Sequence, residues 1–281
     1  GTAPEIVVKN DDEIKDLADS FSKMYREIGE YIAKLETVTA EKERIGAELD
    51  VAAKIQTSML PCIFPPFPNR DEFDIYATMD PAKEVGGDFY DFFMVDDDHL
   101  AFVVADVSGK GVPAALFMVI GKTLIKDHTG LHDDLGEVFT EVNNILCASN
   151  SEEMFITAFE GVLNLKTGEL RYVNAGHEMP FICRKNGVYE PFKVKAGFVL
   201  AGMEGIRYKS GSVQLQPGDK IFQYSDGVPE AMNRKNEQYG MHRLEKVLVQ
   251  NSKKNPAELL PAIKADLDAF AGEAEQFDDI T

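Results

Sequence analysis

The chain has 281 residues, of which 44% are hydrophobic and 27% charged, a balance that is typical of a folded globular protein. Its net charge of −19 argues against a nucleic-acid partner, because an acidic surface repels phosphate backbones. No apolar run approaches the roughly 20 residues of a membrane span, and no signal peptide begins the chain. The three cysteines lie far apart, which indicates neither a disulfide framework nor a zinc site and predicts a cytoplasmic location.

Residues 14–59 carry apolar side chains at alternating spacings of three and four, interrupted by the polar Lys42 and Gln56. A 3.5-residue repeat sustained for nearly seven heptads is typical of a left-handed coiled coil. We therefore predict a long helix that pairs with its copy in a parallel homodimer. The alternative is a helix folded back on its own domain, although a globular domain seldom offers a groove about 70 Å long. Pro61 ends the pattern, so we divide the chain into a signalling helix (1–60) and a second domain (61–281).

The second domain shows strand and helix patterns in separate blocks. Strands are predicted at 73–79, 88–95, 99–107, 156–165, 170–174, 179–184, 212–215 and 220–224. Helices are predicted at 112–127, 135–148, 241–250 and 256–270. This order favours an α+β domain in which two stacked antiparallel sheets are flanked by helices.

Several aspartates share a setting near the ends of predicted strands: Asp88, Asp106, Asp226, and the adjacent Asp278 and Asp279. A carboxylate at the end of an apolar strand is poorly solvated, so it needs a cation or several hydrogen-bond donors. Glycines adjoin Asp88 and Asp226, and Gly109 follows soon after Asp106, so the backbone can approach an ion there. Aspartates without His or Cys companions suit Mg²⁺ or Mn²⁺ better than zinc. For each single Asp-Gly pair, an ordinary turn is the alternative.

Five ordered segments carry a family resemblance: PAKEVGGDFYD at 81–91, ADVSGKGVPAA at 105–115, NAGH at 174–177, YSDGV at 224–228 and DDIT at 278–281. Together they resemble the SpoIIE/RsbU-like branch of the metal-dependent (PPM, type 2C) serine/threonine protein phosphatases, over about residues 52–281. The resemblance implies a PPM-type β-sandwich with flanking helices and a site for two ions, Mn²⁺ or Mg²⁺.

The same resemblance assigns roles to single residues. Asp106 would bridge both ions, with the carbonyl oxygen of Val107 as a further ligand. Asp226 and Asp278 would hold one ion, and Asp88 would serve the other directly or through water. The four aspartates are therefore the candidate catalytic residues. Two divalent ions activate a bridging water and neutralise phosphoryl charge.

The roles of two further residues near this set are left open. Asp279 adjoins Asp278 and is an alternative ligand. His177 in the NAGH segment could be a general acid or a metal neighbour, although a histidine that structures a turn is the favoured interpretation.

The start of the long helix loosely resembles the second helix of a HAMP signalling module. The resemblance rests on Asp11, Asp12, Glu13 and Ile14 and on the apolar positions that follow. Such modules sit just inside a membrane and pass motion from a sensor to an output domain. The resemblance implies that this part lies in the cytoplasm. It leaves open whether an upstream segment, missing here, anchors the full-length protein in the inner membrane.

The sequence thus predicts a Mn²⁺- or Mg²⁺-dependent hydrolase of phosphoserine or phosphothreonine, controlled by its N-terminal helix. By resemblance, its partner is a phosphorylated regulatory protein of the anti-sigma-factor antagonist type. Two alternatives are a degenerate PPM-like module that binds a partner without catalysis and a small-molecule phosphohydrolase. The intact set of aspartates argues against the first.

Overall fold

The computed structural model describes residues 13–281. The chain forms two compact units, one ending at Ala52 and one spanning Ala53–Thr281, and each is described by itself. Among the described residues, none of the helices combines the length and the apolar character needed to cross a membrane.

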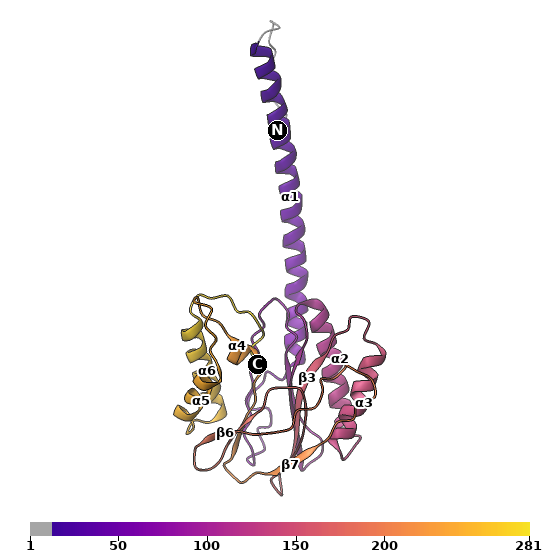
Figure 1. Ribbon diagram of the computed structural model, residues 1–281, viewed down its shortest axis with the longest axis vertical. Coiled ribbons are helices and arrows are strands. Elements are labelled where there is room, and N and C mark those ends of the chain that lie inside the picture. Colours follow the sequence, from indigo (N-terminus) through magenta and orange to yellow (C-terminus); the bar gives the residue numbers. More distant parts are fainter. Residues whose placement is uncertain (1–12) are drawn as a thin grey trace. The chain divides into compact units, whose positions relative to one another are not determined.

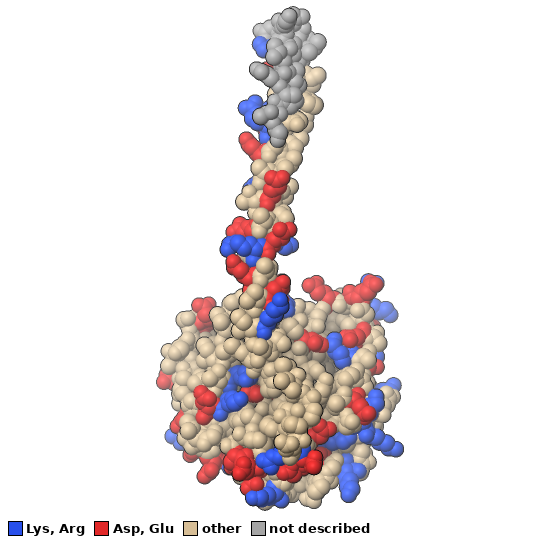
Figure 2. Space-filling model, turned by 180° about the vertical axis from the view of Figure 1, so that it is seen from behind, with Lys and Arg blue, Asp and Glu red and all other residues tan. Residues whose placement is uncertain are grey.

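The predicted long helix is present as α1 (Glu13–Met59), which continues from the first unit into the second. It ends at Met59 because Pro61 has no N–H to continue the helical hydrogen bonds. Seam side chains such as Phe21, Tyr31 and Leu35 are 50–73% exposed in the single chain. Lys, Arg, Asp and Glu are interspersed along the helix in Figure 2, as on a solvated surface. The pairing of the seam stays a prediction, and the HAMP-like Asp11 and Asp12 lie outside the described residues.

The second unit contains a five-stranded antiparallel sheet in the order β1-β2-β3-β4-β7. Its strands are β1 (Phe89–Met94), β2 (His99–Val107), β3 (Ile156–Asn164), β4 (Glu169–Ala175) and β7 (Gly211–Gln214). These bounds lie close to the predicted ones, because alternating β-branched and aromatic residues mark a half-buried strand.

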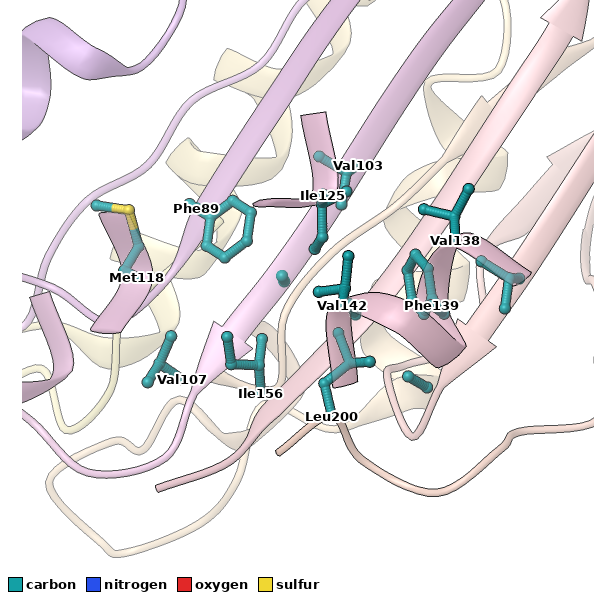
Figure 3. Packing of buried hydrophobic residues seen from close by; sticks show 14 of the residues in the cluster. Phe89, Val103, Val107, Met118, Ile125, Val138, Phe139, Val142, Ile156 and Leu200 are labelled. Atoms are coloured by element: carbon teal, nitrogen blue, oxygen red, sulfur yellow. The ribbon is translucent and has the colours of Figure 1, made fainter. Parts of the chain in front are cut away.

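One face of this sheet is covered by α2 (Val112–Thr129) and α3 (Leu135–Ala148). Figure 3 shows Phe89 and Ile156 from the strands lying among Met118 and Phe139 from the two helices. All four side chains are completely buried. Burying each apolar side chain of this size stabilises the fold by about 1.5–3 kcal/mol. This layer therefore holds in place the end of the sheet that carries the candidate site.

A three-stranded antiparallel sheet, β6-β5-β8, forms the second layer. It consists of β5 (Phe181–Cys183), β6 (Tyr189–Pro191) and β8 (Lys220–Phe222), followed by α4 (Gly227–Glu230), α5 (Met241–Gln250) and α6 (Pro256–Ala271). Figure 1 shows α2 and α3 on one side of the strands and α4, α5 and α6 on the other. The predicted class, two antiparallel sheets flanked by helices and preceded by a long helix, is therefore confirmed.

The predicted strand at 73–79 is wrong. Only Asp80, just after it, makes a β-bridge, to Ile280. The segment packs through its rings instead: Phe73 lies 5.5 Å from Phe67 between ring centroids, and Tyr76 lies 4.5 Å from Phe64. An apolar pattern reports burial, whereas a strand also needs a neighbour that takes its backbone hydrogen bonds.

Candidate active site

Two candidate carboxylates lie side by side at one end of the first sheet. Phe89 of β1 pairs with Ala105 of β2, and extending this register by one residue sets Asp88 opposite Asp106. Across the next strand pair, Asp106 lies opposite Thr157. Directly opposite residues share a face of a sheet, and Phe89 faces the helices. Asp88 and Asp106 therefore point to the other face.

The loop after Asp106 turns the chain sharply into α2. Gly109 and Gly111 have φ values of 86° and 79°, a region that glycine adopts without strain. Two hydrogen bonds fix the start of the loop: the Ser108 N–H donates to the Phe155 carbonyl oxygen (2.9 Å), and the Phe155 N–H donates to Ser108 Oγ (2.8 Å). Asp106 is thus held at a rigid strand end.

The last residues of the chain bring Asp278 to Asp226. Ile280 exchanges two backbone hydrogen bonds of 2.9 Å with the segment that precedes β1. The N–H of Ser225 donates to the Thr281 carbonyl oxygen at 3.1 Å. Since Asp226 follows Ser225, the C-terminal segment runs beside the end of the second sheet. The two sheets contribute acidic groups to the same place.

The carboxylate of Asp279 is hydrogen-bonded by backbone N–H groups. It accepts hydrogen bonds from the N–H groups of Ala82 (2.7 Å), Gly87 (2.6 Å) and Asp88 (3.2 Å). The carboxylate of Asp278 instead forms an ion pair at the rim of the site and accepts a hydrogen bond from the Asp279 N–H (3.0 Å). This geometry favours Asp278 as the ligand and gives Asp279 the task of holding the segment around Asp88.

The carboxylates of the candidate site lie close together, and their burial and mutual repulsion raise pKa values. Burial, followed by the charge of Asp106, raises the pKa of Asp88 well above its usual range. Burial and the charges of Asp226 and Asp278 raise the pKa of Asp106 to about 7. Burial and the charge of Asp278 raise the pKa of Asp226 to about 6. Carboxylates that repel one another in this way favour protons or a cation between them.

The residues present fit a divalent cation. Asp88 Oδ2 is buried without a hydrogen-bond partner, which leaves an acceptor for an ion. A methyl group on Gly87 would stand 2.8 Å from the carbonyl oxygen of Val107, so glycine alone lets these segments approach. All the donors are hard oxygens, as Mg²⁺ and Mn²⁺ prefer. Among residues 13–281, no three Asp, Glu, His or Cys side chains already form a closed metal-binding group.

His177 has the turn-structuring role. Its N–H donates to Asn174 Oδ1 (2.8 Å), and Asn174 Nδ2 donates to its carbonyl oxygen (3.0 Å). The Nδ1 atom of the ring lies 2.8 Å from Thr157 Oγ1. Burial lowers the pKa of His177 to about 3, so the ring is neutral at ordinary pH, which does not suit a general acid.

Gln56 near the end of α1 has a role that the sequence did not predict. Its amide donates to the carbonyl oxygen of Gly86 (2.6 Å) and accepts from the Gly86 N–H (3.0 Å). The side chain is 6% exposed. The polar residue at a seam position is the one sequence signal for this contact, and it also fits a coiled coil with a polar seam residue.

A cavity of about 910 Å³ in the same unit is separate from the carboxylates. Residues 71–80, β2, β8 and α6 contribute to its walls, and none of the four candidate aspartates lines it. The chemistry of the candidate site is therefore at the strand ends and not in this cavity.

Comparison with known proteins places this arrangement in a family. The family model described as stage II sporulation protein E (SpoIIE) matches residues 96–281. Protein IcfG of Synechocystis is 31% identical over 96% of this chain and 45% of its own length. The phosphoserine phosphatase RsbU of Bacillus subtilis is 32% identical over 69% of this chain and 57% of its own length. The chain thus spans about half the length of the curated relatives it matches.

The fold agrees with these matches. The SiaA-PP2C domain of Pseudomonas aeruginosa superposes with a TM-score of 0.74 at 23% identity, over 86% of this chain and 96% of that domain. The fold of this chain therefore has a known counterpart. On the family match and the two relatives, the chain belongs to the SpoIIE family, within the RsbU-like branch of the type 2C (PPM) serine/threonine phosphatases.

Proposed function

We propose that this chain is a metal-dependent phosphatase that hydrolyses phosphoserine or phosphothreonine on a regulatory protein. The observation that carries the proposal is the convergence of Asp88, Asp106, Asp226 and Asp278 from both sheets at one end of the sandwich. Type 2C phosphatases depend on divalent metal ions, and two ions of Mn²⁺ or Mg²⁺ would here supply an activated water and neutralise phosphoryl charge.

Each residue has a distinct task in the proposed site. Asp106 lies between the other carboxylates and is the shared ligand, with the carbonyl oxygen of Val107 beside it. Asp226 and Asp278 hold one ion, and Asp88 serves the other. Asp279 keeps Asp88 in place through its backbone hydrogen bonds.

Turnover tests the assignment best, because an acidic surface also offers many weak cation sites. Phosphate release from a phosphoserine protein with saturating Mn²⁺ should fall below about a tenth in Asp106→Ala, which removes the shared ligand. Asp127→Ala is the matched control, since Asp127 is exposed on α2. Activity of Asp106→Ala close to that of the control would refute the two-ion site.

The two alternative functions predict different results in the same assays. A degenerate module would bind its phosphorylated partner and Mn²⁺ without releasing phosphate. A small-molecule phosphohydrolase would act faster on sugar phosphates than on any phosphoprotein. We propose an antagonist of an anti-sigma factor as the partner, consistent with the phosphoserine phosphatase RsbU among the relatives. Screening phosphorylated candidates from the same genome with Mn²⁺ present tests this choice.

We further propose that α1 pairs with its copy, so that residues 1–60 form a dimeric signalling helix and 61–281 the phosphatase domain. The exposed seam supports this: Ile28, Tyr31 and Leu35 recur at coiled-coil spacing and are 51–73% exposed. Leu35→Asp should shift the sedimentation coefficient to that of a monomer. Ala33→Asp, on the outer face of the same turn, is the matched control and should remain dimeric. A dimeric Leu35→Asp protein would contradict the pairing.

Control of the site by this helix is the last part of the proposal. Gln56 hydrogen-bonds both polar groups of the Gly86 backbone, two residues before Asp88. A shift of the helix end would therefore move the first catalytic segment. Deletion of residues 1–50 and the Gln56→Ala variant should each change turnover or apparent Mn²⁺ affinity, whereas Lys54→Ala, which alters an exposed side chain two residues earlier on the helix, should not. Unchanged kinetics in both would show that the helix is only a tether.

A further inference from the structure

One cation stands at the rim of the carboxylate cluster. The Nζ atom of Lys110 lies 2.9 Å from Asp278 Oδ2 and donates a hydrogen bond to the carbonyl oxygen of Phe277. It also lies 3.8 Å from the centroid of the Phe277 ring. Within residues 13–281, Lys110 is the one Lys or Arg that forms an ion pair with any of the four candidate aspartates.

The backbone on both sides of Lys110 borders open space. Gly109 and Gly111 flank it with positive φ values, and neither has any heavy atom within 4 Å of the place where a Cβ would be. The Lys110 side chain is 29% exposed and that of Asp278 is 28% exposed, so the ammonium lies at the entrance of the site and not in its interior. A lysine there reaches a group that enters from solvent.

The charge balance of the site requires such a group. Two divalent ions would attract the phosphoryl oxygens, yet their four positive charges only match the four negative charges of the aspartates. A bound phosphate monoester, which carries up to two negative charges near neutral pH, would therefore leave the site net negative without a further cation. A strongly hydrated ammonium on a flexible stem suits a phosphate oxygen. An ion held by Asp278 would also weaken the hold of that carboxylate on Lys110, because both cations draw on the same negative charge.

We propose that Lys110 binds the phosphoryl oxygens of the substrate, and that Asp278 holds it aside until the cation site is filled. This inference rests on the proposed phosphatase function and deepens it. It makes Lys110 a phosphate-binding residue that competes with the metal for Asp278, so its loss should act on phosphate and on metal in opposite directions. Loss of a lysine with only a structural role would not change phosphate binding and metal binding in opposite directions.

Isothermal titration of the full chain separates these effects, with Mn²⁺ alone and then inorganic phosphate on the Mn²⁺-loaded protein as probes. In Lys110→Met, phosphate binding should weaken by about tenfold or more. Mn²⁺ binding should stay equal or tighten. Lys110→Arg should restore most of the phosphate affinity, because it restores the charge. Lys166→Met, which removes a lysine from an exposed hairpin, should match the wild type in both titrations.

Three results would overturn the proposal. Phosphate affinity within about twofold of wild type in Lys110→Met would remove Lys110 from phosphate binding. A joint loss of Mn²⁺ and phosphate binding would make Lys110 a support for Asp278 only. A wild-type protein that binds no phosphate when loaded would refute the proposal together with the phosphatase function. A wild type that binds phosphate through Lys110 but releases none from phosphoproteins would refute the phosphatase function alone.

Discussion

Glu160 should make the folding of the phosphatase unit depend on pH in a way that Glu160→Gln does not. Glu160 lies in β3 and is completely buried. The Thr129 hydroxyl lies 2.6 Å from the Ile125 carbonyl oxygen and 2.6 Å from Glu160 Oε1. The Thr129 hydroxyl donates to both oxygens with a single proton, so the buried carboxyl shares one donor and is shielded from water. Burial correspondingly raises the pKa of Glu160 from 4.5 to about 8.

The sign of the effect follows from the raised pKa. The unfolded chain releases this proton near pH 4.5, whereas the folded chain keeps it to about pH 8, so folding takes up a proton between these values. The stability that the neutral carboxyl allows is complete below pH 4.5 and is lost as the pH rises toward 8. The slope is about 1.4 kcal/mol per pH unit. Between about pH 5.5 and about pH 7.5 the wild type should therefore lose about 3 kcal/mol relative to Glu160→Gln, whose side-chain oxygen can still accept from the Thr129 hydroxyl.

Urea unfolding followed by far-ultraviolet circular dichroism measures this difference, since the chain has no Trp for fluorescence. EDTA in the buffer keeps metal binding out of the comparison, and equal m-values would show that only stability has changed. Glu169→Gln, at an exposed position on β4, is the matched control and should follow the wild type at both pH values. A gap between wild type and Glu160→Gln that grows by less than about 1 kcal/mol would refute the buried neutral carboxyl.

Three further experiments test the site and its support. Gly87→Ala should cost about 1–3 kcal/mol of folding free energy and weaken Mn²⁺ binding in calorimetry, because its methyl group would stand 2.8 Å from a backbone carbonyl oxygen. Asp279→Asn should lower the urea midpoint more than Asp278→Asn does, whereas Asp278→Asn should lower Mn²⁺ affinity more; the reverse order would exchange their roles. Lys122→Met should cost about 1–3 kcal/mol, since it removes the 2.6 Å ion pair of the buried Asp91 and leaves it only Lys126 at 3.6 Å, and Asp91→Asn in the same chain should recover most of the loss.

Local sequence signals were enough for most elements of the fold. The predicted helices at 135–148 and 241–250 have the observed bounds of α3 and α5, because apolar periodicity and end signals coincide there. Asp134, for example, caps α3 by accepting from the Gly136 N–H (2.9 Å). The strand prediction at 73–79 is wrong because the aromatic residues of this segment are packed against other rings without pairing as a strand.

The candidate site was predictable as a set of residues but not as an arrangement. The resemblance named the four aspartates, and the sheet register then explains why Asp88 meets Asp106. The supporting contacts join positions far apart in sequence: Gln56 reaches Gly86 across 30 residues, and Asp279 reaches Gly87 across 192. Such contacts leave no periodic signal, because each involves a single side chain and a backbone group.

The assembly of the site from both sheets links metal affinity to folding. Asp88 and Asp106 belong to the first sheet, Asp226 follows the second, and Asp279 ties the chain end to the Gly87 N–H at 2.6 Å. Unfolding of either sheet disperses the carboxylates, so an ion that needs all of them binds only the native unit. Such an ion stabilises the native state by about 2.7 kcal/mol at a hundred times its dissociation constant. By the same linkage, a change that loosens Asp279 should lower ion affinity through its backbone hydrogen bonds alone, without direct contact between its carboxylate and the ion.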